Sequence, residues 1–137
     1  LKVGKVPLDV HKIDTPSFFI STEKDHIAPW QTTYNGYLAF NGEKQFVLGG
    51  SGHIAGIINP PTKRKYGYYT NHDMNLDAKA WFDQAKHHQG SWWPHWLKWL
   101  KSNSGGLIKA RLVEEGKFSP IEDAPGRYVM VKKGYVR

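Results

Sequence analysis

Asp25 and His53 each lie in a loop that follows a predicted buried strand. In an open α/β sheet the loops beyond the carboxyl ends of the strands meet at one edge, so we expect the two side chains to converge. A carboxylate beside an imidazole holds one tautomer of the ring and stabilises the imidazolium that forms when the ring takes up a proton. Hydrolases of the α/β class carry their catalytic residues in the chain order nucleophile, acid, histidine. The pair therefore predicts an acid and a base without their nucleophile, and two solvated surface residues are the alternative.

The predicted elements around this pair follow the order of a parallel α/β sheet. Residues 15–21 and 45–48 are short aromatic and β-branched runs, which favour buried strands. Between them, residues 31–40 predict a helix with Tyr34, Tyr37 and Leu38 on its apolar face. Each strand is followed by a polar or glycine-rich loop, and these loops carry the aspartate and the histidine.

The second half of the chain is predicted to be mainly helical. Apolar spacing predicts a helix over residues 76–88 that Gly90 ends, and another over residues 91–100 whose first residue is its N-cap. A polar, tyrosine-rich connector precedes them at residues 63–75, and residues 128–131 predict a short strand. The sequence thus predicts one α/β unit with helices toward its C-terminal end.

Composition excludes several classes of protein. The chain has 137 residues and no cysteine, so it holds no disulfide framework, thiolate metal site or cysteine nucleophile. It contains no apolar run of the ~18–20 residues that a membrane-spanning helix needs, and its start does not resemble a signal peptide. Because it begins with Leu rather than Met, we expect a segment of a longer protein. The net charge of +7 favours anionic partners weakly, since the basic residues are dispersed.

Other residue clusters have simpler interpretations. Five of the six tryptophans lie in residues 81–99, where they could stack on nucleic-acid bases, but helical spacing favours packing. The glycines of residues 49–56 resemble a dinucleotide-binding loop only weakly, because prolines at 60 and 61 end any helix that follows. The histidines at 72, 87, 88 and 95 show no metal-ligand spacing, so we expect surface residues and no metal site.

Five motifs in order along the chain resemble the C-terminal part of polyhydroxyalkanoate synthases, of the single-subunit type that acts on short-chain 3-hydroxyacyl-CoA. They are EKDHIAPW at 23–30, FVLGGSGHIAG at 46–56, NPP at 59–61, GSWWP at 90–94 and APGRYV at 124–129. The resemblance extends over about residues 13–131, and several motifs in register are specific where one is not. One departure is Lys24, where the family commonly has an acid.

This resemblance implies the C-terminal portion of an α/β-hydrolase-like fold, made of the last parallel strands and C-terminal helices, with a Cys-His-Asp triad. The family's catalytic aspartate falls on Asp25 and its histidine on His53, and the neighbouring His26 would contact substrate in the same pocket. The catalytic cysteine of the family lies upstream in a Gly-x-Cys-x-Gly turn. Residues 1–137 would then be a fragment of the catalytic domain that lacks the nucleophile-bearing part and is inactive alone.

The implied activity is polymerisation of 3-hydroxyacyl-CoA into polyester with release of CoA, without a cofactor. The implied partners are the acyl-CoA, the growing polyester, the rest of the synthase chain and a second copy in a homodimer, with no nucleic acid and no membrane span. The implied location is the cytoplasm, at the surface of polyester granules. Two alternatives are a non-catalytic binding module and part of an α/β-hydrolase esterase or depolymerase with a serine nucleophile.

Overall fold

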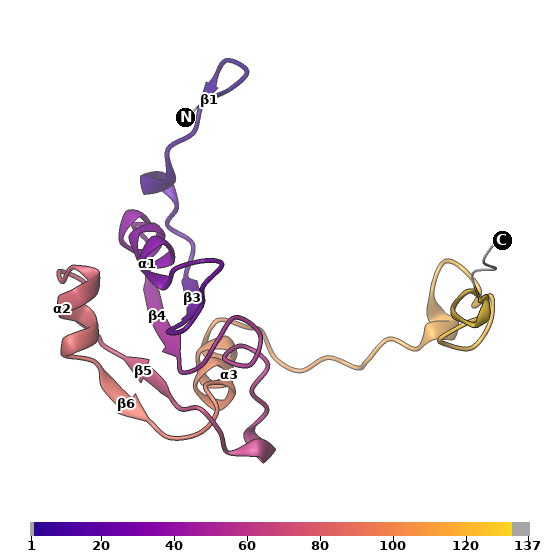
Figure 1. Cartoon of the computed structure of the whole chain (residues 1–137). Coiled ribbons are helices and arrows are strands. Elements are labelled where there is room, and N and C mark those ends of the chain that lie inside the picture. The colour runs from indigo at the N-terminus through magenta and orange to yellow at the C-terminus, as the bar shows by residue number, and fades with distance from the viewer. Residues whose placement is uncertain (1, 133–137) are drawn as a thin grey trace, which may run out of the picture. The chain divides into compact units, whose positions relative to one another are not determined.

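The computed structural model describes residues 2–132 and divides the chain into two compact units, Leu1–Ser104 and Gly105–Arg137. The first unit contains a four-stranded sheet and three α-helices, and Figure 1 shows these elements. Both candidate site residues belong to this unit. None of the helices within residues 2–132 has the length and apolar content needed to cross a membrane.

The sheet contains β3 (Ser17–Thr22), β4 (Lys44–Gly49), β5 (Tyr68–Thr70) and β6 (Lys86–His88), in that spatial order. β3 and β4 are parallel, whereas β5 and β6 each pair antiparallel with the preceding strand. The mixed α/β architecture is therefore confirmed. The predicted parallel pairing of the first two strands is confirmed, whereas β5 and β6, which were not predicted from the sequence, extend the sheet with antiparallel pairing.

One face of the sheet carries the aromatic core. Residues alternate between the faces of a strand, so Phe46 and Leu48 of β4 point to the same side. They pack with residues of α1 (Trp30–Ala39) and α2 (Ala78–Asp83). The buried cluster consists of Trp30, Tyr34, Tyr37, Phe46, Leu48 and Trp81. The prediction of a helix over residues 31–40 is confirmed and Tyr34 and Tyr37 are buried, but Leu38, which we expected on the apolar face, is exposed.

The opposite face of the sheet is covered by α3 (Trp93–Ser102). Phe18 of β3 contacts two tryptophans from this segment, with ring centroids 6.2 Å from Trp92 and 5.5 Å from Trp99. The expectation that the tryptophans pack is confirmed for these residues, while Trp96 on the same helix is exposed. The helix begins at Trp93, one residue later than an N-cap at Ser91 implies, and the Ser91 hydroxyl accepts the N–H of Trp93 at 3.1 Å.

Two predictions about the second half of the chain are wrong. The Asp77 carboxylate caps α2 by accepting the N–H of Ala80 at 2.8 Å, and this helix ends at Asp83 rather than at residue 88. The last predicted turn is instead β6, which pairs with β5 inside the segment that we interpreted as a connector. Strand pairing supplies the backbone hydrogen bonds that a helix would otherwise have made.

The remaining elements are short. β1 (Lys2–Val3) and β2 (Val6–Pro7) form a hairpin, and 3-10 turns occupy Val10–Lys12 and Pro61–Lys63. Within the second unit, the described residues form 3-10 turns at Val113–Glu115 and Tyr128–Met130. The strand predicted over residues 128–131 is therefore wrong.

Candidate active site

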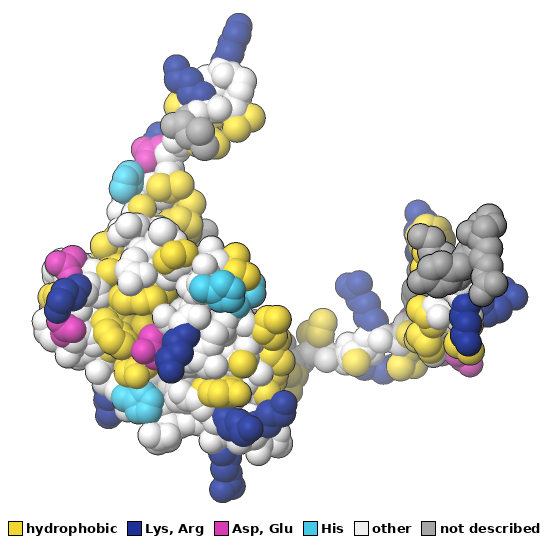
Figure 2. Space-filling model, viewed as in Figure 1, with side chains coloured by type: hydrophobic (Ala, Val, Ile, Leu, Met, Phe, Trp, Pro, Cys, Tyr) yellow, Lys and Arg dark blue, Asp and Glu magenta, His cyan; other side chains and the backbone are white. Residues whose placement is uncertain are grey.

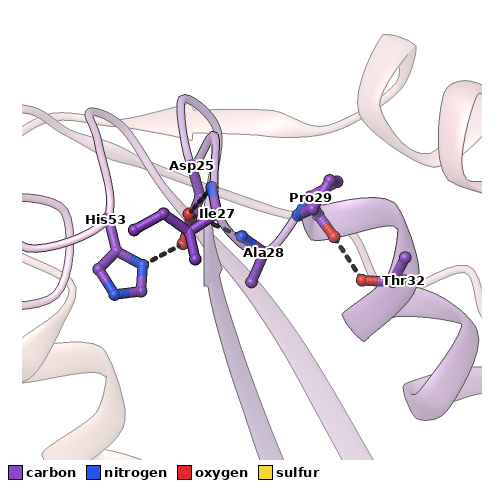
Figure 3. Close-up of polar contacts among 6 residues, drawn as sticks. All are labelled: Asp25, Ile27, Ala28, Pro29, Thr32 and His53. Atoms are coloured by element: carbon purple, nitrogen blue, oxygen red, sulfur yellow. Dashed lines mark hydrogen bonds and ion pairs between the residues drawn. The ribbon is translucent and has the colours of Figure 1, made fainter.

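The parallel pair of strands brings the two predicted site residues together. Thr22, the last residue of β3, is in register with Gly49, the last residue of β4. Asp25 and His53 follow these strand ends by three and four residues, so both loops leave the sheet at the same edge. His53 Nδ1 lies 2.7 Å from Asp25 Oδ2 (Figure 3). The two side chains therefore meet at the edge of the sheet, as the sequence predicted.

The second carboxylate oxygen of Asp25 is also occupied. Oδ1 accepts the backbone N–H groups of Ile27 at 2.9 Å and Ala28 at 3.0 Å (Figure 3). The Ala28 N–H has the largest effect, followed by the His53 hydrogen bond and then the Ile27 N–H, and together they lower the pKa of Asp25 to about 2. At neutral pH this carboxyl group is therefore ionised and accepts hydrogen bonds only.

The charge of Asp25 determines the proton position on the histidine. An ionised carboxylate cannot donate, so Nδ1 of His53 must carry the hydrogen of the 2.7 Å contact. In the neutral ring Nε2 then has a free lone pair and can act as a base. The His53 side chain is 47% exposed and that of Asp25 only 9%, so the acid is shielded while the base is accessible.

Backbone hydrogen bonds tie the two site loops to each other. Glu23 N–H donates to the carbonyl of Gly49, and Lys24 N–H donates to the carbonyl of Ser51, each at 2.9 Å. Ser51 adopts a φ of 98°, a conformation that side-chain-bearing residues rarely occupy. A non-glycine residue held in this region two positions before His53 indicates that the surrounding contacts determine the loop conformation.

Glycine at position 50 is required by a close approach of two backbones. A Cβ atom there would lie 2.2 Å from the carbonyl oxygen of Tyr66, which is too close for any side chain. The Gly50 N–H also donates to the carbonyl of Gly67 at 3.0 Å. The loop that carries His53 is thus held against the segment leading into β5, in addition to the Asp25 loop.

His26 has a different environment from its neighbour Asp25. Its side chain is exposed, and it makes no hydrogen bond within residues 2–132. Its predicted contact with substrate stays a prediction. Lys24, the departure from the family pattern, is likewise exposed.

The site has no nucleophile of its own in the described part of the chain. The sequence contains no cysteine. Nε2 of His53 makes no hydrogen bond to any side chain or backbone group among residues 2–132. The arrangement can therefore accept and return a proton at Nε2, and a nucleophile has to come from outside these residues.

Two histidines that we expected at the surface are partly buried. The His88 ring stacks on Tyr68 at 4.7 Å, and its Nε2 lies 2.8 Å from the Thr70 hydroxyl. His95 packs against Tyr68 and contacts the side-chain oxygen of Gln45 at 3.2 Å. Burial is the main cause that lowers the pKa of both imidazoles. Within the described residues no three His, Asp or Glu side chains are grouped as metal ligands would be.

Comparison with known proteins confirms the resemblance seen in the motifs. The chain is 42% identical over 134 residues to poly(3-hydroxyalkanoate) polymerase 2 of Ectopseudomonas oleovorans, and 41% identical over 133 residues to the poly(3-hydroxyalkanoate) polymerase subunit PhaC of Cupriavidus necator. Each alignment covers 96% of this chain, and 24% and 23% of the respective relative. A PhaC subunit from Rhizobium etli is 40% identical over 90% of this chain and 19% of its own length.

The similarity to poly(3-hydroxyalkanoate) polymerases thus extends over nearly the whole of this chain, which spans about a quarter of the length of the relatives it matches. No protein-family model matches the chain.

Proposed function

We propose that this chain is the C-terminal segment of a polyhydroxyalkanoate synthase and supplies the acid and the base of its Cys-His-Asp triad. The observation that carries the proposal is the contact of 2.7 Å between Asp25 and His53 at the ends of two adjacent parallel strands. The similarity of the chain to poly(3-hydroxyalkanoate) polymerases supports the class of reaction. The intact enzyme would polymerise 3-hydroxyacyl-CoA into polyester and release CoA.

In the proposed mechanism, Nε2 of His53 takes the proton of a cysteine thiol from the upstream part of the protein. The thiolate attacks the acyl carbonyl of the 3-hydroxyacyl-CoA, the C–S bond to CoA breaks, and the proton on Nε2 goes to the departing CoA sulfur. The 3-hydroxyl group of another acyl unit then gives its proton to Nε2 and attacks the enzyme thioester. The ester bond of the polymer forms, the C–S bond to the cysteine breaks, and the cysteine sulfur takes the proton back from Nε2. Asp25 stabilises the imidazolium in each step because it is ionised and fixed by two backbone N–H groups.

The open edge of the sheet supports the placement in a larger α/β-hydrolase-like domain. Within residues 2–132, β3 pairs with β4 on one side and with no strand on the other. A six-residue strand with an unpaired edge is a template for a further strand. We infer that an upstream parallel strand of the intact enzyme pairs there, which would add the cysteine-bearing part on the side of the sheet next to Asp25.

The proposal includes the partners that the similarity implies. These are the acyl-CoA, the growing polyester, the rest of the synthase chain and a second copy in a homodimer, at the granule surface in the cytoplasm. A nucleic-acid-binding module is less well supported. On the face of the first unit drawn in Figure 2, the Lys and Arg side chains are dispersed rather than gathered into one basic patch.

The test is release of CoA from 3-hydroxybutyryl-CoA by the intact enzyme and by this chain alone. We expect no activity from this chain, because acyl transfer lacks its covalent step without the thiolate. In the intact enzyme, His53→Ala should lower kcat by roughly 10³-fold or more, and Asp25→Asn by about 10²–10⁴-fold, through loss of the correct tautomer. CoA release by this chain, or wild-type rates in either variant, would overturn the proposal.

His11→Ala is the matched control for these substitutions. The imidazole of His11 is exposed and makes no polar contact within the described residues, so its removal should leave turnover unchanged. The upstream sequence decides between the two enzyme classes. A Gly-x-Cys-x-Gly turn would support the synthase, whereas serine in place of that cysteine would indicate an esterase or depolymerase.

A further inference from the structure

A short helical turn follows His53, and two carbonyl groups at its end accept hydrogen bonds from tryptophan side chains. Inside the turn, Gly56 N–H donates to the carbonyl of Gly52 at 2.9 Å. At its end, the indole N–H of Trp92 donates to the carbonyl of Gly56 at 3.1 Å, and that of Trp93 donates to the carbonyl of Ile57 at 3.0 Å. The N-cap and the first residue of α3 thus donate hydrogen bonds to two consecutive carbonyls in the segment that begins at His53.

Gly56 is also the point where this segment contacts the Asp25 loop. A Cβ atom on Gly56 would lie 2.3 Å from Cγ2 of Thr22, so the glycine backbone packs directly against that side chain. Thr22 ends β3, and its carbonyl accepts the N–H of Asp25 at 3.3 Å. The position of Gly56 therefore helps to set the spacing between the loops that carry the acid and the base.

Trp92 is itself held in place. The residue is 7% exposed, and its ring stacks on Phe18 of β3 with an interplanar angle of 24°. No other donor within residues 2–132 reaches the Gly56 carbonyl, and Gly56 is buried. Loss of the indole N–H would leave a buried carbonyl without a partner, which proteins generally avoid.

We propose that Trp92, assisted by Trp93, is a positioning residue for His53. It acts through the Gly56 carbonyl and keeps the turn after His53 where Nδ1 meets Asp25. This inference rests on the proposed function only for its effect on turnover, since the geometry belongs to the chain itself. A displaced imidazole can no longer transfer a proton efficiently, and misplacement by about 1 Å can lower a rate by about 10²-fold.

Substitution by phenylalanine separates the hydrogen bond from the packing. Trp92→Phe keeps an aromatic ring against Phe18 and removes the N–H donor. Trp99→Phe is the matched control, because Trp99 lies on the same helix and packs on the same Phe18 at 5.5 Å. The indole N–H of Trp99 is buried without an acceptor among the described residues, so this control removes an N–H that makes no hydrogen bond.

The first readout is the tautomer of His53 in this chain, measured by ¹⁵N NMR of the ring nitrogens in alkaline buffer. We expect the wild-type proton on Nδ1, where Asp25 accepts it, and Asp25→Asn defines the signal of the lost contact. Trp92→Phe should move the population toward the Nε2–H form, and Trp99→Phe should not. A wild-type tautomer in folded Trp92→Phe would overturn the inference. If that variant does not fold, Trp93→Phe is judged by the same criterion.

The second readout is turnover of the intact enzyme. Trp92→Phe should lower kcat by about tenfold or more with a smaller effect on KM, because substrate contacts are not altered. The two proposals fail in distinguishable ways. If His53→Ala leaves turnover intact, the proposed function is wrong whatever the tautomer. If His53→Ala abolishes turnover while Trp92→Phe changes neither tautomer nor kcat, the positioning role alone is wrong.

Discussion

Replacing Gly56 by alanine tests whether the contact between the two site loops is as tight as the geometry indicates. The added Cβ would lie 2.3 Å from Cγ2 and 2.9 Å from Cβ of Thr22, whereas ordinary van der Waals contact begins near 3.4 Å. One of the two segments must therefore move by about 1 Å. Thr22 is buried at the end of β3, so the turn that follows His53 is the part expected to shift.

The expected cost follows from this overlap. Overpacking a rigid interior typically destabilises by about 1–3 kcal/mol. For a domain of this size, that corresponds to a fall in Tm of roughly 4–8 °C per kcal/mol. In the proposed intact synthase, the same shift would separate His53 from Asp25 and lower kcat by about 10²-fold. Thermal and denaturant unfolding of this chain measure the loss of stability, and CoA release by the intact protein measures the fall in kcat.

Gly36→Ala is the matched control, because it makes the same chemical change inside α1 with no atom within 4 Å of the added Cβ. Alanine in a helix interior should stabilise by about 0.5–1 kcal/mol, the opposite sign to Gly56→Ala. Thr22→Ser removes the methyl group that clashes, so the double variant with Gly56→Ala should recover about 1 kcal/mol in a double-mutant cycle. Unfolding of Gly56→Ala within about 0.5 kcal/mol of wild type, or no coupling to Thr22, would refute the reasoning.

Two further predictions concern pH. Burial raises the pKa of Tyr34 to about 12, and its hydroxyl donates to the carbonyl of Leu76 at 2.9 Å. The folded state therefore retains a proton that the unfolded chain loses near pH 10, so the stability should fall between pH 10 and 12. Tyr34→Phe should flatten this fall in alkaline denaturation curves. Because the pKa of Asp25 is lowered to about 2, its stabilising contribution is present above about pH 4 and is lost as the pH falls toward 2. The stability difference between wild type and Asp25→Asn should shrink over that acid range, and a difference independent of pH would contradict the ionised contact.

Much of the site could be predicted because it depends on local patterns. The apolar runs before Asp25 and His53 predicted two buried strands, and the loops after parallel strands necessarily reach the same edge of a sheet. Helix α1 could be predicted because Tyr34 and Tyr37 have the spacing of residues on one core-facing side of a helix. Chain order and residue type were sufficient there, because a strand, a crossover helix and a second strand form a parallel pair.

The errors arose where long-range pairing overrides local preference. Residues 86–88 continue a helical pattern, yet they form β6 because β5 offers its unpaired edge. The partial burial of His88 and His95 follows from that pairing and from contacts with Tyr68, which is distant in sequence. Propensity and periodicity carry no information about such partners.

The sequence by itself determined that Asp25 and His53 follow two adjacent parallel strands and meet at one edge of the sheet, and to which proteins the chain is similar. Only the tertiary structure decided the proton position on His53, through an aspartate whose remaining oxygen accepts two backbone N–H groups. It also decided that Trp92 reaches across 36 positions of the chain to the Gly56 carbonyl. Hydrogen-bond direction and close packing depend on distances of a few ångströms between remote segments, and these are set when the whole unit folds.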